Sequence, residues 1–216
     1  MVVVGEAAGR PRWVNIDEAS CGGDGPHMAV FGSHAGRSRV VELVNHSLTA
    51  RPPQRGVEVL ACHREIEPIN TLIDQRIETL RHYHAKDFGE LRTMLPAAEQ
   101  GPSDVARAAV VVIDGDSLTG VASATSTYND GPASTGISDR SASTLDRVLR
   151  CGRSLDIHTV LSVAQIHDLA PTVAVAQFSS IVEVHEDGRR AWWRRVNMPT
   201  SVELELPAKG TGGTPP

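Results

Sequence analysis

The chain is poor in cysteine, in aromatic residues and in excess basic charge. Its three cysteines, Cys21, Cys62 and Cys151, are far apart and odd in number, so the sequence has neither a disulfide framework nor a CxxC metal motif. Aromatic residues make up 4% of the chain, so the core must rest on Val, Ile, Leu and Ala. The formal charge of −5 disfavours autonomous nucleic-acid binding, because neutralising phosphates takes clustered Lys and Arg.

No hydrophobic run is long enough to cross a membrane. The longest aliphatic run, residues 108–113, is far shorter than the ~20 residues that a membrane span requires. The first residues also lack the basic region and the long apolar region of a signal peptide. We therefore expect a soluble, cytoplasmic protein.

The length of 216 residues, 40% of them hydrophobic, suits one globular domain with a real core. We expect this domain to cover residues 1–206. Residues 207–216 are rich in Gly, Thr and Pro and are expected to form a disordered tail.

Short aliphatic strands alternate along the chain with segments of helical periodicity. Strands are expected at 28–31, 57–62, 108–114 and 157–163, and helices at 40–48, 66–91 and 145–152. The segment 108–114 is continuously aliphatic, as is typical of a strand covered on both faces of a parallel sheet. The alternation predicts an α/β fold with a mainly parallel sheet.

A β-hairpin is expected near each end of the chain. Residues 2–4 and 13–16 flank a turn at 9–11, and residues 180–184 and 191–196 flank a turn at 185–188. Residues 117–143 are rich in Ser, Thr, Gly and Asp and are expected to form a long polar loop.

A glycine-rich segment lies between the first parallel strand and the helix that follows it. It consists of Gly32, Ser33, His34, Ala35, Gly36, Arg37 and Ser38. In such a strand–loop–helix arrangement, backbone N–H groups and the positive end of the helix bind phosphate. Compared with the Walker A pattern G-x-x-x-x-G-K-[ST], the segment is one residue short between its glycines and has Arg in place of Lys. All seven residues are candidates for binding ATP, and the Ser38 hydroxyl is a candidate ligand of Mg²⁺.

A second candidate group follows the aliphatic strand 108–114. Asp114 stands where a Walker B carboxylate would hold the hydration shell of Mg²⁺. The next position, a Glu that orients the attacking water in additional-strand ATPases, is Gly115. Asp116 comes one residue later and is the alternative candidate for a catalytic carboxylate.

These segments together resemble the FtsK/SpoIIIE ATPase domains, and in particular those of EccC, the motor of type VII secretion. In order, the similar segments are 13–16, the G-G-D-G-P-H loop 22–27, strand 28–31, the glycine segment, Asp114 and G-R-S-L-D-I-H at 152–158. The order and approximate spacing match over about residues 11–178. The resemblance implies a three-layer, RecA/FtsK-like P-loop NTPase with β-hairpins at its ends.

The catalytic positions that the resemblance implies are all altered. Arg37 replaces the Lys, Gly115 replaces the Glu, and Gln165 stands one position beyond the place of the family's sensor Gln. The resemblance therefore implies a degenerate, hydrolysis-impaired module of an EccC-like motor, with ATP and Mg²⁺ as candidate cofactors. Its partners would be motor subunits, secretion substrates or further copies of itself, and it would meet a membrane only through these partners, within a membrane secretion complex. The alternative is an active ATPase or DNA translocase, in which Arg37 replaces the Lys functionally.

Two further patterns are weaker. Alternating Arg and Trp at 189–195 could form a surface for single-stranded nucleic acid, but on a hairpin this alternation is more typical of one packed and one solvated face. Gly115–Leu118 also resembles the motif of the GDSL esterases, with Ser117 as nucleophile and Asp156 and His158 as partners. The spacing of these three residues along the chain argues against an esterase.

Overall fold

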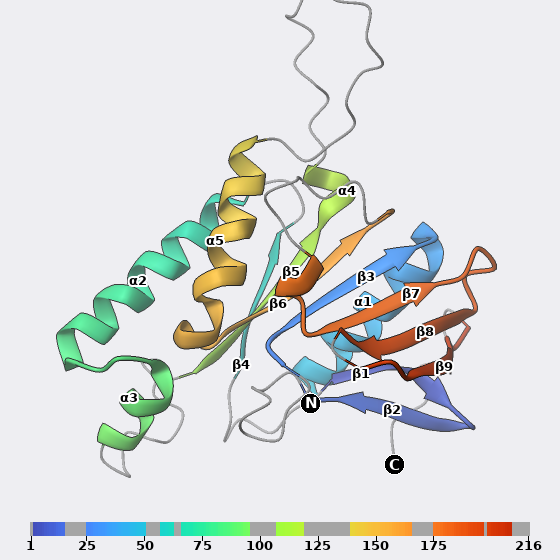
Figure 1. The fold of residues 1–216 in the computed structure, drawn as a ribbon, viewed down its shortest axis with the longest axis horizontal. Helices are drawn as coiled ribbons and strands as arrows, with labels where there is room; N and C mark the ends of the chain where they lie inside the picture. Colours follow the sequence, from blue (N-terminus) through green and yellow to red (C-terminus); the bar gives the residue numbers. More distant parts are fainter. Residues whose placement is uncertain are drawn as a thin grey trace, which may run out of the picture.

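Nine strands form one sheet in the computed structural model, which describes residues 2–15, 25–50, 57–62, 66–95, 107–118, 139–165, 175–196 and 198–208. The strands are β1 (Val2–Ala7), β2 (Arg10–Val14), β3 (His27–Gly32), β4 (Val57–Cys62), β5 (Ala108–Asp114), β6 (Ile157–Val163), β7 (Ser180–Val184), β8 (Arg190–Arg195) and β9 (Ser201–Glu205). Their order across the sheet is β2-β1-β9-β8-β7-β3-β6-β5-β4 (Figure 1). The helices are α1 (His34–Thr49), α2 (Glu67–Tyr83), α3 (Phe88–Met94), α4 (Gly115–Leu118) and α5 (Asp139–Leu155), with a 3-10 turn η5 (Val175–Gln177).

The half of the sheet from β7 to β4 is parallel. Strands β3, β5 and β6 bring their carboxyl ends to one edge, because β6 pairs with β3 on one side and with β5 on the other. The expected strands 57–62, 108–114 and 157–163 are confirmed with the same bounds, and strand 28–31 extends to His27–Gly32. These strands are short and rich in aliphatic residues, although β4 and β6 also contain polar ones.

The two faces of the parallel half are covered by different helices. On one face, Val30 and Val112 pack with Val40 of α1 in one buried cluster. On the other, Phe31 and Ile113 pack in a second cluster with residues of α2, α3 and α5. Helices α2 and α5 lie together on one side of the sheet in Figure 1, and α1 lies on the other. The predicted three-layer α/β arrangement is confirmed.

The two expected hairpins are confirmed as β1–β2 and β7–β8, and both lie on the same side of the parallel strands. An additional strand, β9, pairs antiparallel with both β8 and β1 and so joins the hairpins into one sheet. The first hairpin turns at Ala8 and Gly9, whose φ angles of 51° and 71° suit a two-residue turn, rather than at 9–11. Pro11 lies in β2, an edge strand, where a missing N–H costs little.

The helix expected over 66–91 is two helices. Helix α2 ends at Tyr83, and the next residue, His84, adopts a left-handed conformation with a φ of 54°. Helix α3 begins after Asp87, whose carboxylate accepts a hydrogen bond of 2.7 Å from the N–H of Glu90. The helix expected at 145–152 is α5, which begins earlier, at Asp139, and ends later, at Leu155.

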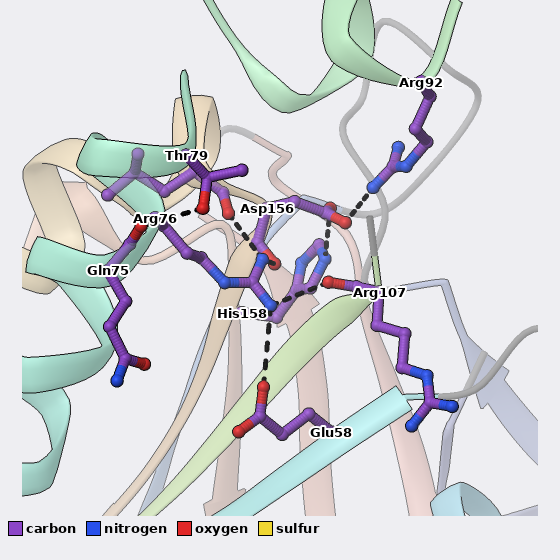
Figure 2. A network of polar contacts seen from close by, with 9 residues as sticks. Glu58, Gln75, Arg76, Thr79, Arg92, Arg107, Asp156 and His158 are labelled. Atoms are coloured by element: carbon purple, nitrogen blue, oxygen red, sulfur yellow. Dashed lines mark hydrogen bonds and ion pairs between the residues drawn. The ribbon is translucent and has the colours of Figure 1, made fainter. Parts of the chain in front are cut away.

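A buried arginine connects α2 to the amino ends of two central strands (Figure 2). The Arg76 guanidinium donates to the carbonyls of Leu155 (2.7 Å), Asp156 (3.1 Å) and Arg107 (2.7 Å). Its carboxylate neighbour, Glu58, is 3.8 Å away. Burial lowers the pKa of Arg76 to about 10, so the side chain stays charged at neutral pH. This network fixes the sheet at the edge opposite to the carboxyl ends of the strands.

Several expectations lie outside the described residues. They concern most of the polar loop 117–143, the loop 22–24 and residues 209–216 of the expected tail. In the described part of the chain, no helix is long and apolar enough to cross a membrane.

Candidate nucleotide site

The junction between β3 and α1 is much shorter than the expected glycine loop. Strand β3 ends at Gly32 and α1 begins at His34, so only Ser33 lies between them. Gly32 has a φ of +108°, and a Cβ there would come within 2.0 Å of the Val184 carbonyl oxygen, so only glycine fits. The N–H of Arg37 already bonds to the Ser33 carbonyl (2.9 Å). Gly36, Arg37 and Ser38 therefore belong to the start of α1.

The turn between β7 and β8 lies against the start of α1. The Ser33 hydroxyl donates to the His185 carbonyl (3.0 Å), and Arg39 donates to the Gly188 carbonyl (2.9 Å). A Cβ at Gly36 would be 2.2 Å from Val184 Cγ1 and 3.1 Å from Gly188 Cα. Gly36 thus allows the helix and this turn to approach each other closely.

The side chain of Arg37 is buried beneath this junction, with 2% of its surface exposed. Its Nε donates to the Gly32 carbonyl (2.8 Å), one terminal nitrogen donates to Ser162 Oγ (3.1 Å), and the other donates to Asp116 Oδ2 (2.5 Å). The guanidinium therefore joins the ends of β3 and β6 to α4, with a hydrogen bond from each of its three nitrogens.

Asp116 is held on both sides of its carboxylate. Oδ2 accepts from Arg37, and Oδ1 accepts from the N–H of Ala164 (3.2 Å). The exposed ring of His34 is 3.8 Å from the same carboxylate. Asp116 thus serves as the acidic partner of a largely buried ion pair.

The position before Asp116 has no room for a side chain. A Cβ on Gly115 would lie 2.1 Å from Val163 Cγ1 and 2.9 Å from the Ser162 carbonyl oxygen. A glutamate at this position would require the end of β6 to move.

The other predicted site residues lie around this ion pair. Asp114 ends β5 in register with Ser162 and is half-buried. Ser38 is half-buried in α1, Ala35 is exposed beside the β7–β8 turn, and Gln165 is exposed just after β6. Ser162 was not among the predicted site residues, and its position in β6, a strand that also contains His158 and Thr159, gave no distinguishing signal.

The residues that resemble the catalytic groups of a GDSL esterase do not lie close together. Ser117 follows the carboxyl end of β5, whereas His158 is in register with Val110 near the amino end of the same strand. Parallel strands rise about 3.3 Å per residue, so the two residues lie at opposite edges of the sheet. His158 instead contacts Asp156, with 3.0 Å between Nε2 and Oδ1 (Figure 2).

The Arg/Trp hairpin has one packed and one solvated face, as the sequence predicts. Trp193 is 5% exposed and the Arg12 guanidinium lies 4.3 Å from its ring centre, whereas Trp192 is 36% exposed. Arg190 is engaged by Asp187 at 2.9 Å. The hairpin therefore does not present an uninterrupted basic surface.

Comparison with known proteins gives a fold. No protein-family model and no curated protein sequence matches the chain. Among solved structures, 94% of the chain aligns with 28% of the cytoplasmic domain of the Thermomonospora curvata type VII secretion ATPase EccC, with a TM-score of 0.67 and 16% identity. It aligns over 94% with 64% of the pCW3 conjugation coupling protein TcpA, in a monomer form with ATPγS (TM-score 0.63, 13% identity).

A third similar structure holds ATPases 2 and 3 of Thermomonospora curvata EccC in complex with a signal sequence peptide. The alignment covers 95% of this chain and 42% of the EccC chain, with a TM-score of 0.64 and 14% identity. The chain thus spans less than two thirds of the length of each of these proteins. The chain has the fold of an FtsK/SpoIIIE-type P-loop ATPase domain, as the EccC and TcpA structures do.

Proposed function

We propose that the chain is a motor-related module that does not hydrolyse ATP and acts by docking to motor subunits or secretion substrates of an EccC-like type VII system. It would work on the cytoplasmic side of a membrane secretion complex. The observation that carries this proposal is the buried Arg37 guanidinium, bonded to the Gly32 carbonyl, Ser162 and Asp116.

The residues at the β3–α1 junction do not fit a bound Mg²⁺–ATP. A phosphate-binding loop works by leaving several backbone N–H groups pointed at an anion. Here the helix starts two residues after the strand, and the β7–β8 turn packs against its first turn. The charge of Asp116 is balanced by Arg37, so this carboxylate is not available as a ligand or base.

The crowding at Gly115 supports a loss of hydrolysis independently of phosphate binding. Water attack in an additional-strand ATPase relies on a carboxylate at this position, and here even a Cβ would meet Val163 at 2.1 Å. The alternative, an active motor with Asp116 as catalytic carboxylate, would require the Arg37–Asp116 pair to break first.

The docking role is supported by the folded scaffold, which is kept although the catalytic positions are altered. The three-layer fold and its tightly packed sheet are kept, and structures of the same fold include an EccC bound to a signal sequence peptide. A stable fold without a working site is suited to binding a partner.

The test is ATP turnover by the purified full chain. We expect no Mg²⁺-dependent phosphate release above the protein-free blank, and no difference between the native chain and Asp114→Ala. Turnover that Asp114→Ala abolishes would show a working Walker B carboxylate and would overturn the proposal.

A further inference from the structure

Strands β8 and β9 have a face turned away from α1. Trp193 packs on the α1 side, so Trp192, the residue before it in β8, points to the opposite face. In Figure 1, none of the described helices lies across β8 and β9 on the side that carries α2 and α5. Trp192 is 36% exposed on this face.

Two carboxylates lie on either side of Trp192. The strand register pairs Trp192 with Glu183 on β7 and with Glu203 on β9. Directly opposed residues of antiparallel strands have Cβ atoms about 5 Å apart and share a face. Glu183 is exposed, and the Glu203 side chain is 50% exposed. We name these three residues the Trp192 row.

The charges around the Trp192 row leave it acidic. Glu205, two positions beyond Glu203 on β9, pairs with Glu6 on β1. Two arginines, Arg190 and Arg194, flank Trp192 on the same face of β8. Arg190 is 4.0 Å from Glu203, but its main partner is Asp187 at 2.9 Å. An indole between two carboxylates offers an electron-rich ring face, which attracts a cation. The carboxylates beside it can accept hydrogen bonds from a guanidinium, which has several N–H donors in one plane.

On the opposite face of β8, the neighbouring tryptophan is already stacked by an arginine of this protein. There, the guanidinium of Arg12 lies 4.3 Å from the centre of the Trp193 ring. In the described part of the chain, no guanidinium lies over Trp192, whose ring neighbour is His185 at 5.9 Å between centroids.

We propose that the Trp192 row is a docking site for an arginine-bearing segment of a partner protein, with the guanidinium stacked on Trp192 and bonded to Glu183 and Glu203. Arginine suits this site better than lysine because its planar group is weakly hydrated, stacks on rings and bonds two carboxylates at once. The inference rests on the docking role proposed above and names the chemistry of its partner.

The indole N–H signals of the full ¹⁵N-labelled chain provide the test, since the protein has three tryptophans and Trp192→Phe assigns one of them. The probe is the acetylated, amidated peptide Gly-Arg-Gly-Arg-Gly, and its citrulline analogue is the uncharged control. We expect the arginine peptide to shift the Trp192 signal saturably, to leave the Trp193 signal in place, and to bind at least tenfold more tightly than the citrulline peptide.

The double variant Glu183→Gln, Glu203→Gln keeps the shape of the surface and removes its charge. We expect it to keep the native spectrum and to weaken peptide binding about tenfold. Equal shifts at Trp192 and Trp193, unchanged binding by the double variant, or a shift caused by a single-stranded oligothymidine and not by the peptide would each overturn the inference. The readout is binding and not ATP turnover, so this inference and the loss of hydrolysis can fail separately.

Discussion

Replacing Arg37 by alanine is expected to lower the free energy of unfolding by about 3 kcal/mol, measured by urea denaturation at neutral pH. The substitution removes hydrogen bonds to Gly32, Ser162 and Asp116, and it leaves the Asp116 carboxylate without its cation. Removing one partner of a fully buried pair costs 3–5 kcal/mol. The lower end applies because 38% of the Asp116 side chain is exposed and water can partly replace the arginine.

Arg39→Ala is the matched control for this prediction. Arg39 lies on the same helix and makes one hydrogen bond, to the Gly188 carbonyl, so its loss should cost no more than about 1 kcal/mol. Arg37→Lys should be intermediate, because an ammonium keeps the charge but cannot span the three acceptors. If Arg37→Ala is as mild as Arg39→Ala, the guanidinium does not hold the strand ends together.

Acidification from pH 6.5 to pH 5 is expected to destabilise the protein through His27 by about 2 kcal/mol. His27 begins β3 with 2% of its surface exposed, and its ring lies against Gly152 of α5. Burial lowers its pKa from 6.5 to about 3, with further lowering by His158 and Arg153 and a smaller opposing effect of the Leu149 carbonyl.

The sign follows from where the proton binds. Between pH 3 and pH 6.5 the unfolded chain protonates His27 and the folded chain does not, so acid favours the unfolded state. The contribution of the neutral, buried His27 to the free energy of unfolding is fully present above pH 6.5. It is lost as the pH falls, by about 1.4 kcal/mol for each pH unit. Over 1.5 pH units this gives the expected loss of about 2 kcal/mol.

The comparison that isolates His27 is the pH dependence of unfolding in His27→Asn, with the exposed His46→Asn as control. The loss between pH 6.5 and pH 5 should shrink by about 2 kcal/mol in the first variant and stay unchanged in the second. A histidine NMR titration of the native chain supplies a direct check. An ordinary His27 titration near pH 6.5 would contradict the expectation.

The parallel strands could be predicted because each carries its own signal. Strands β4, β5 and β6 are short aliphatic segments with polar flanks, and their bounds were correct. Strand β9 was missed although Val202, Leu204 and Leu206 alternate with polar residues, which is the pattern of a half-buried strand. The placement of both hairpins on one side depends on the β1–β9 pairing between the two ends of the chain, which no local pattern reveals.

The features of the candidate site that the sequence did not predict were missed for a different reason. The replacement of Lys by Arg37 and of Glu by Gly115 was visible in the sequence, and so was the shortened glycine segment. The direction of the Arg37 side chain was not, because it depends on Ser162 and Asp116, which are distant in sequence and come together only when β3, β5 and β6 assemble. The break between α2 and α3 was hidden because apolar residues keep a helical period across His84.

The most direct test of the central claim, that Arg37 and the β7–β8 turn close the nucleotide site, is calorimetric titration of the full chain with ATP and with ADP, each with and without Mg²⁺. We expect no saturable heat at millimolar nucleotide. Micromolar binding that is strengthened by Mg²⁺ would contradict it, because the phosphates could then be held only if Arg37 left Asp116 and the start of α1 opened.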